Sequence, residues 1–184
     1  MGSQSTRLSL GEIVAMTDTN RHRGDAQFLD ALVHWLNEPP GRGEVVGFER
    51  QPEVGRMLWV LKALHTSLAV SGLRHFLETG MIGRHLYDAE RWARQLGAMR
   101  TAVYLTRAAA LGPSGRIPVQ DEERFAFLES LEGTNANPFS RIDQEYRDAV
   151  LDEVADSVRS FVRDHSSEIE AAFAQLPVIG GSAA

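Results

Sequence analysis

The stretch Met57–Gly80, MLWVLKALHTSLAVSGLRHFLETG, is the longest apolar segment of the chain. Its apolar side chains recur every three or four residues, which is the period of an α-helix, and they cover most of the helix surface. A helix of this kind must be buried, so we expect it at the centre of the fold. Ser71 and Gly72 stand in its middle and predict a bend or a close crossing by another helix. Gly80 is expected to end it in a left-handed conformation.

Apolar residues at helical spacing predict further helices on both sides of this stretch. Asp25 is placed to cap the second of them, and Ser9 with Glu12 and Ser167 with Glu170 match the capping-box pattern at two helix starts. The expected segments are Leu10–Met16, Asp25–Asn37, Tyr87–Leu96, Met99–Leu111, Asp121–Leu131, Arg141–Asp164 and Glu168–Gln175.

The connections between these segments indicate how they pack. Gly97 and Ala98 leave so short a link that the flanking helices must form an antiparallel hairpin. No segment alternates as a strand would. We therefore predict an all-α fold of about six to eight helices around the central apolar helix, with a helical hairpin and a long acidic C-terminal helix.

Length and composition bound the domain organisation and the class of protein. The 184 residues favour one domain: a polar segment over 1–24 with a short helix, a single all-α domain over 25–176, and a flexible tail over 177–184. Cysteine is absent, which excludes disulfides and thiolate chemistry and suits a cytoplasmic location. Lys62, Arg74 and His75 would be costly in hydrocarbon, so we expect no membrane span.

The charge of the chain is concentrated in its C-terminal third. The formal net charge is −6, and residues 121–176 hold 14 Asp and Glu against 5 Arg. A mainly acidic surface disfavours direct binding of nucleic acid and favours protein partners, or serves solubility alone.

The last long helix carries an acidic ridge, defined by Glu145, Asp148, Asp152 and Asp156, opposite its apolar residues. These four carboxylates span about 16 Å, or roughly one charge per 5 Å, which is sparser than the charge every ~1.7 Å along duplex DNA. An ordinary solvated helix face is the more common meaning of such a pattern. Imitation of DNA would need a dimer mate, or a second patch formed by Asp121, Glu122, Glu123 and Glu129.

Four segments of the chain match the sequence pattern of a known family. They are VSGLRHFL (Val70–Leu77), LGAM (Leu96–Met99), TRAAALGPSG (Thr106–Gly115) and IDQEYRDAVLDEVADSVRSFVRDH (Ile142–His165). Together they resemble a bacterial family of all-helical proteins whose best-known member is a dimeric DNA mimic. The likeness covers roughly residues 52–165, and the chain departs from the family pattern at Val70, Ser71, Leu73 and His75. Its family motif segment is represented by Ser71, Gly72, His75 and Phe76.

No catalytic or metal-binding motif is found. Ser71 lacks the G-x-S-x-G frame of a serine nucleophile. His65, His75 and His85 are spaced ten residues apart without a ligand pattern, so we expect buried, hydrogen-bonded histidines rather than a metal site. We predict no cofactor.

Three hypotheses about function follow. The first, implied by the resemblance, is a non-enzymatic protein that occupies a basic DNA-binding protein such as a transcription factor and forms a homodimer. The second is an interaction module of the immunity or antitoxin type that binds by shape. The third is an enzyme with a cleft near Ser71, His75 and Glu78, which we rank last.

Overall fold

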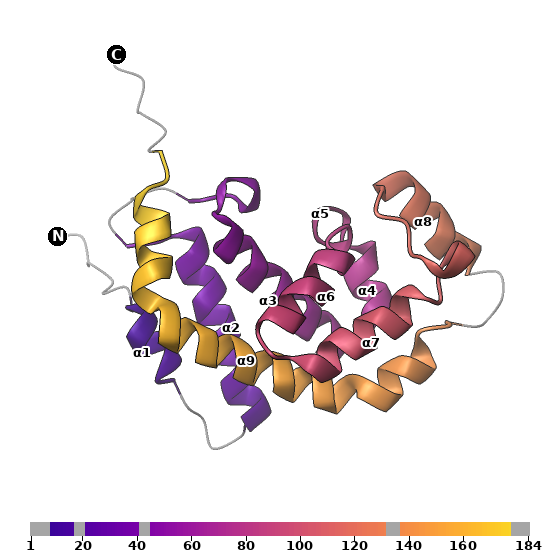
Figure 1. Cartoon of the computed structure of the whole chain (residues 1–184), viewed down its shortest axis with the longest axis horizontal. Coiled ribbons are helices and arrows are strands. Elements are labelled where there is room, and N and C mark those ends of the chain that lie inside the picture. Colours follow the sequence, from indigo (N-terminus) through magenta and orange to yellow (C-terminus); the bar gives the residue numbers. More distant parts are fainter. Residues whose placement is uncertain (1–7, 17–20, 41–44, 132–136, 178–184) are drawn as a thin grey trace, which may run out of the picture. The chain divides into compact units, whose positions relative to one another are not determined.

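The computed structural model describes residues 8–16, 21–40, 45–131 and 137–177, and within these ranges all regular structure is helical (Figure 1). The all-α prediction is therefore confirmed. The α-helices and 3-10 turns are α1 (Leu10–Val14), α2 (Arg21–Asn37), η1 (Phe48–Arg50), α3 (Glu53–Val70), α4 (Leu73–Glu78), α5 (Gly80–Gly83), α6 (Leu86–Gln95), α7 (Met99–Ala109), η2 (Pro113–Gly115), α8 (Asp121–Ser130) and α9 (Ser140–Ala174).

The described residues divide into two compact units. The terminal unit contains the residues up to Trp59 and those from Arg159 onward, and the middle unit contains Val60–Val158. Helices α3 and α9 each contribute a segment to both units. The domain boundaries at residues 25 and 176 stay a prediction. None of the described helices combines the length and the apolar character that a bilayer span requires.

The central apolar stretch is divided between helices α3 and α4, and its last residue, Gly80, begins α5. Helix α3 ends at Val70, and Gly72 adopts φ = 89°, a left-handed conformation that glycine tolerates. The amides of Ser71 and Gly72 both donate to the Ser67 carbonyl at 2.8 Å, which closes the end of α3 before α4 begins. The predicted bend is thus a break.

The prediction that Gly80 ends this stretch in a left-handed conformation is wrong. Thr79, with φ = −76° and ψ = 99°, ends α4, and Gly80 is the first residue of α5. The amides of Ile82 and Gly83 donate to the Thr79 carbonyl at 3.1 and 2.6 Å. The chain therefore starts a new turn immediately instead of stopping at the glycine.

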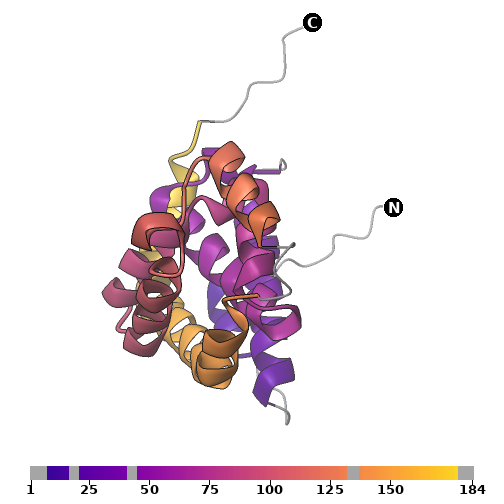
Figure 2. The same ribbon diagram turned by 90° about the vertical axis from the view of Figure 1, so that its right-hand side faces the viewer.

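The predicted hairpin is formed by α6 and α7, which lie side by side (Figure 2). Gly97 has φ = 75°, and the amide of Ala98 donates to the Ala93 carbonyl at 2.8 Å. Ala93, Ala98 and Ala102 form a buried cluster, so the small side chains allow the two helices to approach closely. The glycine at the turn and the alanines between the two helices are features of the sequence from which this hairpin can be predicted.

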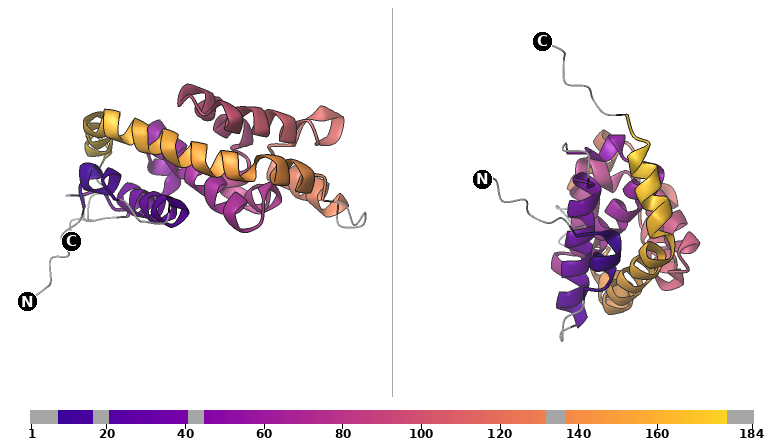
Figure 3. Two further views of the ribbon diagram at one scale, coloured as in Figure 1. Left: turned by 90° about the horizontal axis from the view of Figure 1, so that it is seen from below. Right: turned by 90° about the vertical axis from the view of Figure 1, so that its left-hand side faces the viewer.

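In the terminal unit α1 packs against α2 (Figure 3), and the Ser9–Glu12 capping box is present. Asp25 does not cap α2, because the helix begins four residues earlier, and its side chain is buried instead. The Arg159 guanidinium donates to Asp25 at 3.2 Å and to the carbonyls of Val14 and Met16 at 3.1 and 2.9 Å. This one arginine thus ties the end of α1 to α2.

Two other expectations about helix ends and histidines need correction. The predicted break before a terminal helix is only a kink at His165, with φ = −123°, and Ser167 lies inside α9 and does not cap a helix there. His65 is buried as expected, but His75 is exposed, because α4 turns its Phe76 and Leu77 inward and its His75 outward.

Candidate partner-binding surface

The four residues of the acidic ridge lie on the part of α9 that belongs to the middle unit. Glu145, Asp148 and Asp156 are exposed and Asp152 is half-buried. The opposite side of the helix buries Ile142, Val150, Val154 and Val158. Burial of this apolar stripe is what orients the carboxylates outward.

The N-terminal end of the ridge is partly neutralised. Arg107 of α7 donates to Glu145 at 2.8 Å, and its guanidinium lies 5.2 Å from the centre of the Tyr146 ring. The hydrogen bond that Arg107 donates to Glu145 raises the pKa of Arg107, and its hydrogen bond to Tyr146 adds to the effect. Glu145 therefore offers a partner less negative charge than its exposure suggests.

The second predicted patch is on α8. Asp121, Glu122 and Glu123 occupy the first turn of α8, and these three and Glu129 are exposed. The N-cap residue Gln120 makes no side-chain hydrogen bond to this helix start, and the three carboxylates stabilise it through the helix dipole. We call these four residues the α8 patch.

A buried arginine positions the α8 patch. Arg124 has no exposed surface, and its guanidinium donates to the carbonyls of Leu77, Gly80 and Val119 at 2.9, 3.0 and 2.8 Å and to Asp121 at 2.7 Å. It therefore joins α8 to the turn between α4 and α5. The sequence analysis missed Arg124, although its place four residues before Leu128 on the apolar side of α8 was a usable signal.

The family motif segment forms part of a buried polar network. Ser71 and His75 are exposed, whereas Gly72 and Phe76 are buried. Asp143 accepts a hydrogen bond from the Leu73 amide at 3.2 Å and another from the Tyr104 hydroxyl at 2.6 Å. A side chain at position 72 would collide with this carboxylate, so Gly72 is required both by its φ and by space.

The titration of this network follows from its burial. Burial raises the pKa of Asp143, an effect that hydrogen bonds from Tyr104 and Leu73 and the charge of Arg147 partly offset. The pKa of Tyr104 is raised strongly, first by burial and then by Asp143. The phenol therefore stays protonated and remains a donor to Asp143.

A polar pocket of about 350 Å³ adjoins this network and is lined by Ser71, Asp143, Arg147 and Asp148 among others. His75 and Glu78 are not among its lining residues, and Glu78 pairs with Arg74 at 2.7 Å on the surface. The three residues of the enzyme hypothesis are thus not assembled in this pocket. In the described part of the chain no group of three or more His, Asp or Glu side chains could hold a metal ion.

Asp143, Tyr104 and Glu153 are further residues that the sequence analysis did not single out. Glu153 accepts from the amides of Arg100 and Thr101 at 3.1 and 2.7 Å, and it thereby caps α7. Asp143 lies seven residues before the buried Val150, on the apolar side of α9. An acidic residue within an apolar stripe could have identified Asp143 from sequence, whereas no nearby sequence feature indicated the role of Glu153.

Comparison with known proteins gives one result. The family model described as DMP19-like protein, a family of DNA mimics, matches residues 49–165. No curated protein matches the chain. No solved structure matches it either. The match includes α3 to α8 and most of α9, and with them the acidic ridge, the α8 patch and the polar network. The chain therefore belongs to the DMP19-like protein family.

Proposed function

We propose that this chain is a non-enzymatic protein that binds a basic DNA-binding protein, such as a transcription factor, through the acidic ridge and the α8 patch. The observation that carries the proposal is that seven of these eight carboxylates are exposed, all of them in the unit that the family match covers. Membership of a family of DNA mimics supports this use of the surface. The cytoplasm is the expected location for such a partner.

The charge density of the acidic ridge is too low for the ridge to imitate DNA by itself, so the proposal requires further carboxylates. Four carboxylates over about 16 Å are fewer than the phosphates of a duplex of that length, and Arg107 offsets one of them. The α8 patch adds four more carboxylates. A homodimer would double the number, and we propose that the protein acts in that form.

The test is capture of partners from a bacterial lysate, with duplex DNA as competitor. The informative variant combines Glu145→Gln, Asp148→Asn, Asp152→Asn and Asp156→Asn. The matched control combines Glu49→Gln, Glu53→Gln, Asp164→Asn and Glu168→Gln, which removes the same charge from exposed positions of the terminal unit.

The proposal expects a DNA-binding protein that is released by salt and by duplex DNA, lost with the ridge variant and kept with the control. Equal capture by both variants, in low and high salt, would contradict the proposal. That result would favour the module that binds by shape, for which Met99 and Val103 offer exposed apolar side chains one turn apart on α7.

A further inference from the structure

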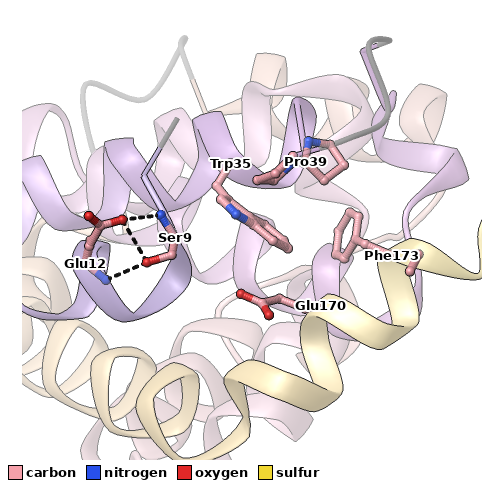
Figure 4. Close-up of a pocket in the computed structure, with 8 residues that line it drawn as sticks. Ser9, Glu12, Trp35, Pro39, Glu170 and Phe173 are labelled. Carbon is pink, nitrogen blue, oxygen red and sulfur yellow. Dashed lines mark hydrogen bonds between the residues drawn. The ribbon is translucent and has the colours of Figure 1, made fainter. Parts of the chain in front are cut away.

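In the terminal unit the described residues form a pocket of about 440 Å³ (Figure 4). Its lining includes Ser9 and Glu12 of the α1 start, Trp35 of α2, Pro39 after α2, and Glu170 and Phe173 of α9. All of these positions lie outside the residues matched by the family model. The pocket is therefore not explained by membership of the family.

The inner wall of the pocket is aromatic. The rings of Trp35 and Phe173 meet edge to face, with centroids 5.3 Å apart and planes at 75°. Both side chains are almost fully buried, at 5% and 1% exposure. Only a small part of each ring therefore borders the pocket, as an apolar edge that an occupant can contact.

The wall also contains a hydrogen-bond donor without an acceptor. The indole nitrogen of Trp35 is buried and has no hydrogen-bond partner among the described residues. In Figure 4 it lies on the edge of the ring turned toward Ser9 and Glu170. An unsatisfied buried N–H is unfavourable, and an occupant that brings a carbonyl oxygen would relieve it.

The rim of the pocket is negative. Glu170 is exposed and points toward the pocket beside Trp35 (Figure 4). Glu12 accepts hydrogen bonds from the amide and hydroxyl of Ser9 at 2.7 and 2.8 Å, and these bonds lower its pKa. Glu12 is thus a carboxylate at neutral pH, and none of the described residues that line the pocket is an Arg, Lys or His.

We propose that this pocket receives an arginine side chain from a segment of a partner protein. A guanidinium is attracted to aromatic side chains and donates to carboxylates, so it suits a site with an aromatic edge and an acidic rim. The main chain of the same segment would supply the carbonyl that Trp35 needs. This site is separate from the ridge and the α8 patch in residues and in unit, so it extends the proposed function rather than restating it.

The test follows the three indole N–H resonances of the full-length protein by NMR during titration with N-acetyl-arginine methylamide. Trp59→Phe and Trp92→Phe variants assign the Trp35 signal by elimination. N-acetyl-citrulline methylamide is the uncharged probe of the same shape. Glu170→Gln removes the rim charge at an exposed position, and Glu168→Gln is the control on the same helix, since Glu168 does not line the pocket.

The arginine probe should shift the Trp35 signal and saturate, and the citrulline probe should bind about five- to tenfold more weakly. Glu170→Gln should weaken the arginine probe to the level of citrulline, while Glu168→Gln should leave its affinity unchanged. The proposal is overturned if the Trp35 signal does not respond, or if both probes bind alike and Glu170→Gln has no effect.

Discussion

The interior and the outer face of the middle unit use charged residues in opposite ways. Inside, Arg124 and Asp143 are at least 96% buried, and their hydrogen bonds hold helix ends together. Outside, Asp148 and Asp156 are exposed on the side of α9 opposite its buried valines. Asp143 is a buried residue of the interior and Glu145 is exposed on the outer face, although they are only two residues apart. A count of acidic residues therefore overestimates the charge that this protein can offer a partner.

Among the tests of this difference between buried and exposed charges, Arg124→Met should have the largest effect. The change leaves the buried carbonyl of Leu77 and the partly buried carbonyl of Gly80 without their donor, so we expect a loss of about 3–5 kcal/mol in the free energy of unfolding. Urea denaturation followed by circular dichroism measures it. Arg100→Met, at an exposed position, should change stability by less than about 0.5 kcal/mol. Similar losses for the two variants would show that Arg124 does not hold the interior together.

A pair of glycine substitutions isolates the contact between position 72 and Asp143. Gly97→Ala introduces only backbone strain, since nothing lies near its added Cβ, and should cost about 1–2 kcal/mol. Gly72→Ala adds a collision with Asp143 and should cost about 2–4 kcal/mol.

Repeating this comparison in an Asp143→Ala background, again by urea denaturation, provides the control. Gly72→Ala should cost less there than in the wild-type background, because the obstructing carboxylate is gone and only the backbone strain at position 72 remains. An undiminished cost of Gly72→Ala would mean that the collision does not contribute to it.

The pH dependence of stability tests Asp143 itself. Its pKa is raised in the folded state from the ordinary 3.8, so the folded protein binds this proton more tightly than the unfolded chain does. The free energy of unfolding that Asp143 contributes therefore falls as pH rises from the unfolded pKa through the folded pKa. Asp143→Asn has no such proton to lose.

We therefore expect Asp143→Asn to be more destabilising, relative to wild type, at pH about 3 than at pH about 7. Urea midpoints of both proteins across this range supply the measurement. A difference that grows toward neutral pH would show that the folded state favours the carboxylate, contrary to the burial of this group.

The smallest expected difference in stability is between substitutions of two acidic residues of α9, Glu145 and Glu153. Glu145→Gln breaks an exposed pair with Arg107 and should change stability by no more than about 0.5 kcal/mol. Glu153→Gln weakens the cap of α7 and should cost about 1 kcal/mol. Thermal unfolding of the two variants, each with the same charge change, compares them. If Glu145→Gln were the costlier, the ridge would be part of the fold and not a free surface.

The features that sequence predicted correctly depend on nearby residues, whereas those it predicted wrongly depend on other turns of the chain or on distant residues. Helix periods, the glycine at 97 and the capping box at Ser9 were predictable because they depend on residues within one or two turns. The expectations for Gly80, Asp25 and Ser167 were wrong because neighbouring turns or distant side chains, such as Arg159 for Asp25, decide what those residues do.

The sequence by itself determined the all-α class, the helical hairpin and the acidic side of α9, since amphipathic periodicity requires only that one face of each helix be buried. Only the tertiary structure decided which charges remain available. Arg124, Asp143 and Glu153 each form hydrogen bonds with residues tens of positions away in the sequence. The fold likewise brings together the rings of Trp35 from α2 and Phe173 from α9. Such contacts depend on which helices meet, and local sequence carries no record of that.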